Sequence, residues 1–523
     1  MSDVTLAYLS ASEALARFRS GTLSPVELVD AVLARTEAVN ATVNAFSATY
    51  VDEARAQARA AELRYRDGTA RPLEGIPVAI KDEAMWAGHR VTQGSLIYRD
   101  YVADVSEPMV QRILDAGAIA HAQTTTPEFC VAGFTWSRLW GVTRNPWAPD
   151  FTPGGSSGGS GAALAAGMTT LATGSDIGGS IRIPAAFCGV VGYKPPYGRV
   201  PVMPPFGLDD FCHNGPMGRS VADVALLQDV IAGPHPIDVA SVAPTPTLGT
   251  PSADVRGWRI GYSVGLGDYV VAADVRRSLL AVVEVFRAAG ATVEEIDIDV
   301  RRADVRDAAS IHFGAIFGSS VGAEIDEHGD EMCEYTKSFA ESTTKAAADR
   351  GLLAGLEIED RVWQPIARAV YGYDVVLVPT LATTGIAADQ DYYADPIVID
   401  GSPLVDPFDA FMTTAFNIAS RCPVLVVPGP RAGNGVPVGV QIVARPYEDH
   451  RVFEAGAAFE RHRPDAPEWP RTTSPRWCRS RREASVVVGF TAPRLAAFLQ
   501  CHGGDHQGCD RVGPPPAEPG VRQ

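Results

Sequence analysis

The feature that most restricts the fold is a run of small residues over positions 152–182, TPGGSSGGSGAALAAGMTTLATGSDIGGSIR. Glycine lets the backbone turn tightly and approach other groups closely, so a run of this kind suits a loop built into a core. The alanine-rich block at 162–168 predicts a helix, and the apolar residues after it predict a strand near 170–173. Because a flexible Gly/Ser linker carries neither element, we expect this segment to be packed inside the protein.

Two general motifs can be compared with this segment. A phosphate-binding P-loop needs a lysine directly after its glycines, and the segment contains no lysine. The stretch GSSGG at 155–159 does match the G-x-S-x-G elbow of serine hydrolases, with Ser157 as the nucleophile. That elbow requires a strand immediately before it, whereas residues 145–149, NPWAP, predict a loop. The elbow stays open as an alternative.

Lysine is scarce in this chain, and one lysine stands at a chemically informative place. Of 45 cationic residues only four are lysine, namely Lys81, Lys194, Lys337 and Lys345. Lys81 follows the apolar run 76–80, IPVAI, so we expect it at the end of a buried strand. A buried lysine is costly unless it is paired or neutral, and lysine, unlike arginine, can lose its proton. The simpler alternative is a strand-end lysine that reaches water.

Elsewhere the chain alternates apolar strands and helices, the pattern of a layered α/β fold. Ser24-Pro25-Val26-Glu27 is a capping box before a helix that runs to about residue 39. The other predicted helices cover 51–64, 107–116, 220–232, 273–289 and 449–462. The predicted strands cover 76–80, 118–122, 258–262, 291–297, 374–379, 424–428 and 438–443.

Composition limits the classes of partner. The formal charge of −17 opposes binding to nucleic acid or anionic lipid, and no apolar stretch is long enough for a membrane span. The first residues, MSDV, lack a signal peptide's basic start and apolar block. The eight cysteines contain no C-x-x-C pair, which argues against a zinc site or a disulfide framework. We expect a cytoplasmic protein with no metal and no organic cofactor.

The Gly/Ser segment, followed by 174–184, GSDIGGSIRIP, resembles the amidase signature family, whose core motif is GGSSGG followed by GGS-x-R-x-P. The resemblance extends to 75–82, GIPVAIKD, and to the shorter matches at 192–195, 215–217 and 439–443. It covers roughly residues 10 to 465. It implies hydrolysis of carboxylic amides through a serine acyl-enzyme, with esters, anilides and carbamates as further substrates of the same chemistry.

The resemblance also assigns roles to residues that match the family's motifs. Ser180 matches the nucleophile, Ser156 the bridging serine that follows a cis peptide, and Lys81 the base. The backbone amides that match the family's oxyanion hole belong to Ile177, Gly178, Gly179 and Ser180. The roles are chemically coherent, because a serine hydroxyl needs an adjacent base and a buried, uncharged lysine can act as one.

Neighbouring residues allow less specific expectations. Asp176 and Arg182 are expected to form a structural ion pair, with a supporting role at the site as the alternative. Phe129 and Trp136 belong to an aromatic cluster where the family often lines its substrate pocket. Substrate binding by these two rings is a hypothesis beside ordinary core packing.

The expected fold is an α/β amidase-signature fold, a mixed β-sheet sandwiched between helices, with the sheet topology supplied by the resemblance. The predicted domain covers 1–470, with a helical flank at about 6–65, a signature core at 72–300, a helical insertion at 300–372 and a core return at 373–465. Residues 471–523 carry eight arginines against four acidic residues, and predict a disordered or aberrant tail. Because family members are often dimers, a homodimer is an expected assembly.

Two other functions compete with a free-standing amidase. One is the A subunit of a tRNA-dependent amidotransferase, which hydrolyses glutamine and needs an aspartate seven residues before the asparagine of a late Asn-Leu-Ala-Gly element. Here that element is represented by Asn417, position 410 is alanine, Asp409 is one place off, and Ser420 replaces the glycine. The other is a catalytically silent binding or scaffold protein.

We predict that removal of residues 471–523 leaves both amide hydrolysis and the melting temperature unchanged, because the tail shows no clear hydrophobic periodicity beyond a short apolar patch. Activity assays and thermal melts of the truncated and full-length chains test this. A truncated chain that no longer folds would show that the domain extends past residue 470.

Overall fold

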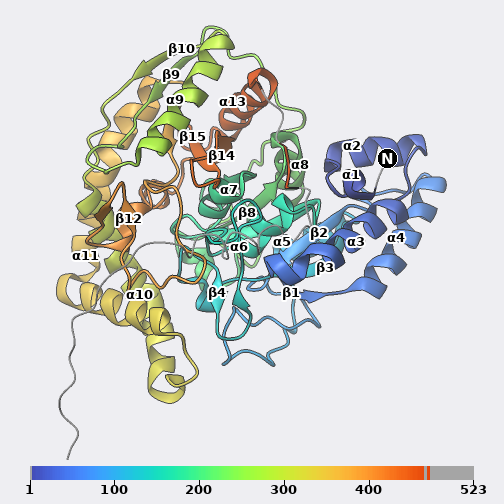
Figure 1. Ribbon diagram of the computed structural model, residues 1–523, viewed down its shortest axis with the longest axis horizontal. Coiled ribbons are helices and arrows are strands. Elements are labelled where there is room, and N and C mark those ends of the chain that lie inside the picture. Colours follow the sequence, from blue (N-terminus) through green and yellow to red (C-terminus); the bar gives the residue numbers. More distant parts are fainter. Residues whose placement is uncertain (1–2, 465–467, 471–523) are drawn as a thin grey trace, which may run out of the picture. The chain divides into compact units, whose positions relative to one another are not determined.

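The computed structural model describes residues 3–464 and 468–470, so the predicted tail at 471–523 lies outside the described residues. Its main element is an 11-stranded sheet with the strand order β1-β3-β2-β6-β8-β7-β14-β15-β11-β9-β10 (Figure 1). The strands are β1 (Phe46–Thr49), β2 (Pro77–Lys81), β3 (Ile119–Thr124), β6 (Leu171–Asp176), β7 (Val191–Lys194), β8 (His213–Gly218), β9 (Arg259–Tyr262), β10 (Thr292–Glu295), β11 (Val375–Pro379), β14 (Val424–Gly429) and β15 (Val438–Val443). Two hairpins pair β4 (Trp136–Ser137) with β5 (Gly141–Val142) and β12 (Val398–Ile399) with β13 (Ser402–Pro403).

The large sheet is mixed, which confirms the predicted fold class. Strand β2 runs parallel to both of its neighbours, β3 and β6, and β9 runs parallel to β10 and β11. The central strands from β6 to β15 pair antiparallel. Seven of the eight strands predicted in the sequence are present within one or two residues at either end, and the eighth, predicted near 170–173, is β6, which ends three residues later.

Thirteen α-helices surround the sheet in the described residues. They are α1 (Asp3–Ala7), α2 (Ala11–Ser20), α3 (Pro25–Val43), α4 (Val51–Arg66), α5 (Pro108–Asp115), α6 (Gly158–Ala165), α7 (Arg182–Cys188), α8 (Val221–Ile231), α9 (Ala273–Ala288), α10 (Arg302–His328), α11 (Glu334–Gly372), α12 (Ala415–Ile418) and α13 (Asp449–His462). Helix α3 begins with the predicted capping box. The Ser24 side chain accepts from the helix backbone, and Glu27 accepts the Ser24 backbone N–H at 2.8 Å.

Helices cover both faces of the sheet, because side chains of a strand alternate between its two faces. On β14, Leu425 and Val427 belong to the core shared with α8, α9 and α13. Val426, between them, belongs to the opposite core, which contains α6 and α7. The sheet therefore buries apolar side chains on both faces, as a layered α/β fold requires.

Two long helices, α10 and α11, pack against each other and against α12 at one end of the sheet (Figure 1). Helix α11 is interrupted at Gly351, whose φ of 76° and ψ of 162° are not helical. Phe313 of α10 and Phe339 of α11 are buried in one apolar cluster with Phe416 of α12. This arrangement places part of the helical pair beside the chain that follows β6.

Three strands of the sheet were not among those predicted, namely β1, β7 and β8. The sequence of β8, HNGPMG, contains two glycines and a proline, residues that are depleted in strands. A Cβ on Gly215 would lie 2.4 Å from the Tyr193 carbonyl oxygen, so the close approach of β7 and β8 requires glycine here.

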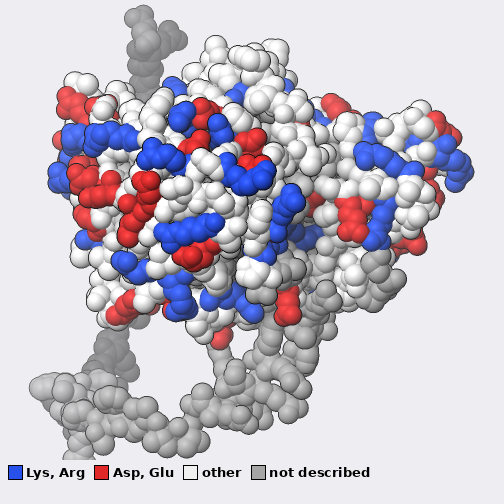
Figure 2. Space-filling model, turned by 90° about the horizontal axis from the view of Figure 1, so that it is seen from above, with Lys and Arg blue, Asp and Glu red and all other residues white. Residues whose placement is uncertain are grey.

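Among the described residues no helix combines the length and the apolar character needed to cross a membrane. On the face drawn in Figure 2, acidic and basic side chains are interspersed. The net negative charge is therefore not gathered on that face into one acidic patch.

Candidate active site

The candidate site forms at one edge of the sheet, where two neighbouring parallel strands end. Strand β2 ends at Lys81 and its neighbour β6 ends at Asp176. Carboxyl ends of adjacent parallel strands lie at the same edge of a sheet. The lysine and the glycine-rich loop 177–181 are therefore brought together by topology, although about a hundred residues separate them in sequence.

Lys81 is buried, with 1 % of its surface exposed, and its side chain has three oxygen partners. Its Nζ donates to Ser156 Oγ at 2.7 Å and to Ser175 Oγ at 2.8 Å. It also lies 3.1 Å from Glu83 Oε1. The predicted contact between lysine and the first serine of GGSSGG is therefore present, together with a carboxylate that the sequence analysis did not identify.

Ser156 lies in the turn that leads into α6 and follows a cis peptide bond between Gly155 and Ser156. A Cβ on Gly155 would lie 2.1 Å from the Phe134 carbonyl oxygen, so only glycine fits there. The next residue, Ser157, donates its backbone N–H to the Ser180 carbonyl oxygen at 3.1 Å. This bond ties the GGSSGG turn to the loop that carries Ser180.

The elbow alternative finds no support in this geometry. Residues 143–157 are all described, and none of them belongs to a strand except in an isolated bridge at Phe151. The Ser157 side chain is fully buried, and its Oγ donates to the Ser175 carbonyl oxygen at 3.4 Å. Ser157 is therefore held away from the surface of the site.

Ser180 is 8 % exposed and lines a hollow with Gly155, Ile177 and Gly178. Thr413 and Thr414 donate their hydroxyls to the Gly178 carbonyl oxygen at 2.7 and 3.1 Å. Because carbonyl and N–H of a trans peptide point in opposite directions, these bonds turn the N–H of the following residue away from the two threonines. Gly179 has a φ of 130°, a conformation that favours glycine.

Asp176 and Arg182 form a buried ion pair at the two ends of this loop, as predicted. The guanidinium donates to both carboxylate oxygens, at 2.8 and 2.9 Å, and both side chains have no exposed surface. Burial alone would raise the pKa of Asp176, but the charge and hydrogen bonds of Arg182 hold it well below its usual range. The same carboxylate accepts the backbone N–H groups of Ile181 and Arg182, so the pair fixes the loop around Ser180.

Glu83 stands in the turn directly after β2, where its N–H donates to the Lys81 carbonyl oxygen at 2.8 Å. Burial acts to raise the pKa of the Glu83 carboxyl, but the Lys81 charge and hydrogen bonds with Cys130, Ser175 and Lys81 hold that pKa below its usual value. The sequence could have identified Glu83 by its position two residues after Lys81. A tight turn brings the side chains of two such residues close together.

Cys130 lies beside Glu83 and lines the hollow that contains Ser180. Burial, reinforced by the Glu83 charge, raises the pKa of its thiol far above the usual value. The thiolate is the nucleophilic form of cysteine, so Cys130 presents an unreactive thiol to the hollow.

Six aromatic rings line the hollow. Rings line it from three parts of the chain that the sequence analysis did not connect, α10, α11 and residues 392–411. These rings belong to Phe313, Phe317, Phe339, Tyr392, Phe408 and Phe411. The described residues that line the hollow include no charged side chain.

Phe129 and Trp136, the two rings proposed from the sequence, are not among the residues that line this hollow. Phe129 is buried against Tyr98, with ring centroids 5.7 Å apart. Trp136 stacks on Phe134 at 5.6 Å and meets Tyr335 edge-on at 4.8 Å. Both rings therefore pack in clusters of aromatic side chains, the simpler of the two expectations.

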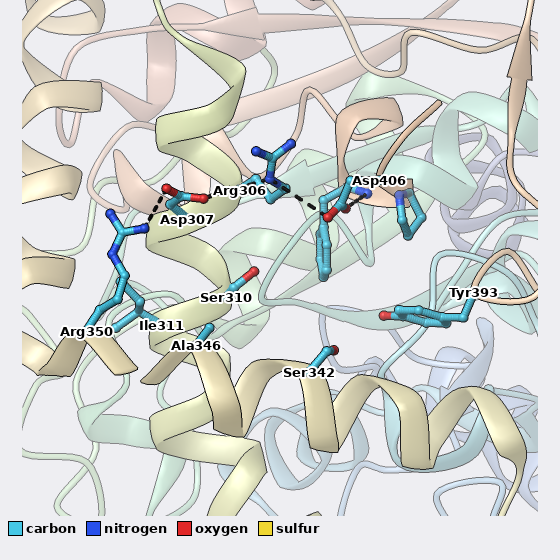
Figure 3. Close-up of a pocket in the computed structure, with 11 residues that line it drawn as sticks. Arg306, Asp307, Ser310, Ile311, Ser342, Ala346, Arg350, Tyr393 and Asp406 are labelled. Atoms are coloured by element: carbon cyan, nitrogen blue, oxygen red, sulfur yellow. Dashed lines mark hydrogen bonds and ion pairs between the residues drawn. The ribbon is translucent and has the colours of Figure 1, made fainter. Parts of the chain in front are cut away.

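A second cavity of about 290 Å³ adjoins the first, and Phe408 lines both. Figure 3 shows its polar side chains, with Arg306 paired to Asp406 and Arg350 paired to Asp307. Arg306 also lies 3.3 Å from Asp409. The arginines of this cavity are therefore already paired with carboxylates.

One group of described residues has a donor set suited to a metal ion, Asp209, Asp210 and His312. His312 Nε2 and Asp209 Oδ1 are 2.7 Å apart and satisfy each other. None of the three lines the hollow with Ser180.

Comparison with known proteins was made on this basis. A family profile described as Amidase matches residues 27–453. An acylamidase of Rhodococcus erythropolis is 33% identical over 485 residues, which cover 90% of this chain and 98% of the relative. The A subunit of the glutamyl-tRNA(Gln) amidotransferase of Geobacter metallireducens is 31% identical, over 85% of this chain and 95% of the relative.

Solved structures agree with these relatives. A bacterial aryl acylamidase of the amidase signature family has a TM-score of 0.81 and 28% identity, covering 88% of this chain and 97% of its own. A 6-aminohexanoate cyclic dimer hydrolase, solved with its substrate, has a TM-score of 0.76 and 25% identity, covering 89% and 99%.

We predict that the Asp176–Arg182 pair is essential to stability. Arg182→Ala leaves a buried carboxylate without its partner, which lowers the free energy of unfolding by about 3–5 kcal/mol. Urea titration measures the change. Arg256→Ala, at a pair whose side chains are 78% and 51% exposed, is the matched control and is expected to cost less than about 1 kcal/mol. Equal losses in the two variants would contradict a special role for the buried pair.

Proposed function

Because the chain belongs to the amidase signature family and is an amide-hydrolysing enzyme, we propose that Ser180 is its nucleophile and that Ser156 and Lys81 carry the proton. The observation that carries this proposal is the buried contact of 2.7 Å between Lys81 Nζ and Ser156 Oγ, beside a hollow lined by Ser180. A serine hydroxyl becomes an effective nucleophile only when a base takes its proton.

In the proposed acylation, Ser180 Oγ attacks the substrate carbonyl carbon. Its proton passes to Ser156 Oγ, while the Ser156 proton passes to the free amine of Lys81. The resulting ammonium returns a proton through Ser156 to the leaving nitrogen as the C–N bond breaks. Water then attacks the acyl-enzyme by the same route, releasing the carboxylic acid and restoring Ser180.

The negative charge on the carbonyl oxygen needs N–H donors that are in place before the reaction. We assign this role to the backbone amides of the loop 177–180. The threonine bonds to the Gly178 carbonyl support the assignment, because they hold one peptide of this loop in a single orientation. A Cβ on Gly179 would lie 2.2 Å from Thr413 Oγ1, so this orientation depends on glycine.

We propose amides with an apolar, aromatic acyl or amine group as substrates. An apolar ring that leaves water to contact the phenylalanine walls gains free energy in proportion to its buried area. An amino acid such as glutamine brings an ammonium and a carboxylate, whose burial without partners is costly. Among the residues that the structure describes, the lining of the hollow offers those charges no counter-ion.

The amidotransferase subunit remains the alternative, since several relatives carry that name. Asp409, the carboxylate nearest to the position used in that subunit, is buried and lies 3.6 Å from Arg302 and 3.3 Å from Arg306. Because Asp409 is already paired with these two arginines, its carboxylate is not free to bind a substrate ammonium. The pairing of Asp409 with these arginines favours the free-standing amidase. We place this enzyme in the cytoplasm and expect it to form a homodimer.

We predict that a fluorophosphonate probe forms one adduct, on Ser180. Ser180→Ala removes the labelled residue, and Lys81→Ala and Ser156→Ala lose the base and the relay, so labelling falls by about 10²–10⁴-fold. Peptide mapping by mass spectrometry locates the adduct, and Ser342→Ala, in the second cavity, is a control that keeps it. An adduct on Ser157 would revive the elbow, and no adduct in a folded protein would favour the silent scaffold.

We predict that an aryl amide such as 4-nitroacetanilide is hydrolysed with a kcat/KM at least about 100-fold above that for glutamine, because uncompensated charges are costly to bury. Phe313→Ala removes one wall and lowers kcat/KM for the aryl amide about tenfold, while acetamide, too small to reach the wall, is little affected. Ammonia and nitroaniline release are measured with the purified chain alone. Preferred hydrolysis of glutamine would contradict the proposed substrate class.

A further inference from the structure

Lys81 does not stand alone at the site, because the Glu83 carboxylate lies 3.1 Å from its Nζ. The lysine side chain is 1% exposed and the glutamate side chain 22%. The turn after β2 holds the glutamate in place, through its N–H bond to the Lys81 carbonyl oxygen. The proposed reaction uses Lys81 and Ser156 and leaves this carboxylate without a role.

The number of N–H groups on Lys81 Nζ indicates a role for the Glu83 carboxylate. A protonated lysine has three N–H donors, and three oxygens surround Nζ, on Ser156, Ser175 and Glu83. A free amine has two N–H donors and one lone pair. It can accept the Ser156 proton only if the lone pair faces Ser156, which requires both N–H groups to be directed elsewhere.

We propose that Glu83 is a positioning residue for Lys81: with Ser175 it takes the two N–H groups of the free amine, turns the lone pair toward Ser156, and stabilises the ammonium that forms when Ser180 gives up its proton. The inference rests on the proposed function. No net proton is consumed, since the proton that reaches Lys81 during attack returns through Ser156 to the leaving nitrogen.

The other titratable groups around the pair do not supply this charge. The Cys130 and Cys212 thiols have pKa values raised far above normal, mainly by burial. Burial, together with the Glu83 charge, raises the pKa of Glu107 to about 8. The two thiols stay neutral at pH 7 and the Glu107 carboxyl is mostly protonated there, so Glu83 is the main anion among these described neighbours of Lys81.

The test is the pH profile of kcat/KM for Glu83→Gln. Its acidic limb is the range at low pH in which kcat/KM rises with pH. Glutamine keeps the size and an acceptor oxygen but removes the negative charge that favours the ammonium. Without that charge the ammonium is less stable, so the acidic limb of the profile is expected to move to lower pH by about one to two units. The plateau value of kcat falls about tenfold or more, because the ammonium formed during attack has lost its counter-ion.

Two variants separate charge from packing. Glu83→Asp keeps the charge, so its acidic limb is expected to stay within about half a unit of the native value even if kcat falls. Glu284→Gln removes a carboxylate that is 67% exposed on α9 and paired with Arg287, so it is expected to leave the limb unmoved. A limb that moves equally in Glu83→Asp and Glu83→Gln would overturn the proposal.

Fluorophosphonate labelling at the same pH values separates a failure of the Glu83 proposal from a failure of the proposed function. Labelling of Ser180 in the native protein, with an unmoved limb in a cooperatively melting Glu83→Gln, overturns the role of Glu83 and leaves the proposed function intact. Absence of labelling at Ser180 in the folded native protein overturns both. If Glu83→Gln fails to melt cooperatively, Glu83→Ala is assayed with and without added formate. A limb that returns toward its native pH with formate supports the proposal, and an unchanged profile overturns it.

Discussion

The ion pair between Asp176 and Arg182 connects the end of a central strand to a helix that packs on the sheet. Besides Asp176, the guanidinium donates to the Thr413 carbonyl oxygen at 2.8 Å, to Gln441 Oε1 at 2.7 Å and to Asn417 Oδ1 at 2.6 Å. A fully buried charge is tolerated only when its donors are satisfied, and these acceptors satisfy it. The short loop spanned by the pair contains Ser180 and the proposed oxyanion donors. The geometry of the proposed reacting centre therefore depends on a network whose residues do not line the hollow.

Much of the fold and the positions of the candidate site residues could be predicted from the sequence, because both leave local signals. Apolar runs at 375–379 and 438–443 predict strands since they are buried on both faces. Lys81 could be recognised as one of four lysines in the chain, placed at the end of an apolar run. The two glycine-rich motifs could be recognised because close backbone approach restricts the residues allowed. At Gly155 and Gly179 an added Cβ would lie 2.1 and 2.2 Å from neighbouring atoms. Such positions admit one residue type, so their pattern is specific.

The aromatic lining of the hollow could not be predicted in the same way. Phe313, Phe339 and Phe411 lie in unrelated stretches of sequence, and each has the ordinary pattern of a core phenylalanine. Only the packing of α10 and α11 beside the Ser180 loop turns these rings toward one hollow. Phe129 and Trp136 are near the motifs in sequence, but nearness along the chain did not bring them to the hollow. The proposed catalytic residues and most of the aromatic rings that line the hollow thus come from different parts of the chain.

The network around Arg182 has a consequence for synthesis on the ribosome. Lys81, Ser156 and Ser180 have all been polymerised when Arg182 is added, but the Thr413 carbonyl that binds its guanidinium comes 231 residues later. Until then the guanidinium lacks this partner, together with those on Asn417 and Gln441. Contacts of such sequence separation slow folding and leave partly folded chains exposed to aggregation. The nascent chain therefore cannot complete the network that holds the Ser180 loop until residues 413–441 have been synthesised.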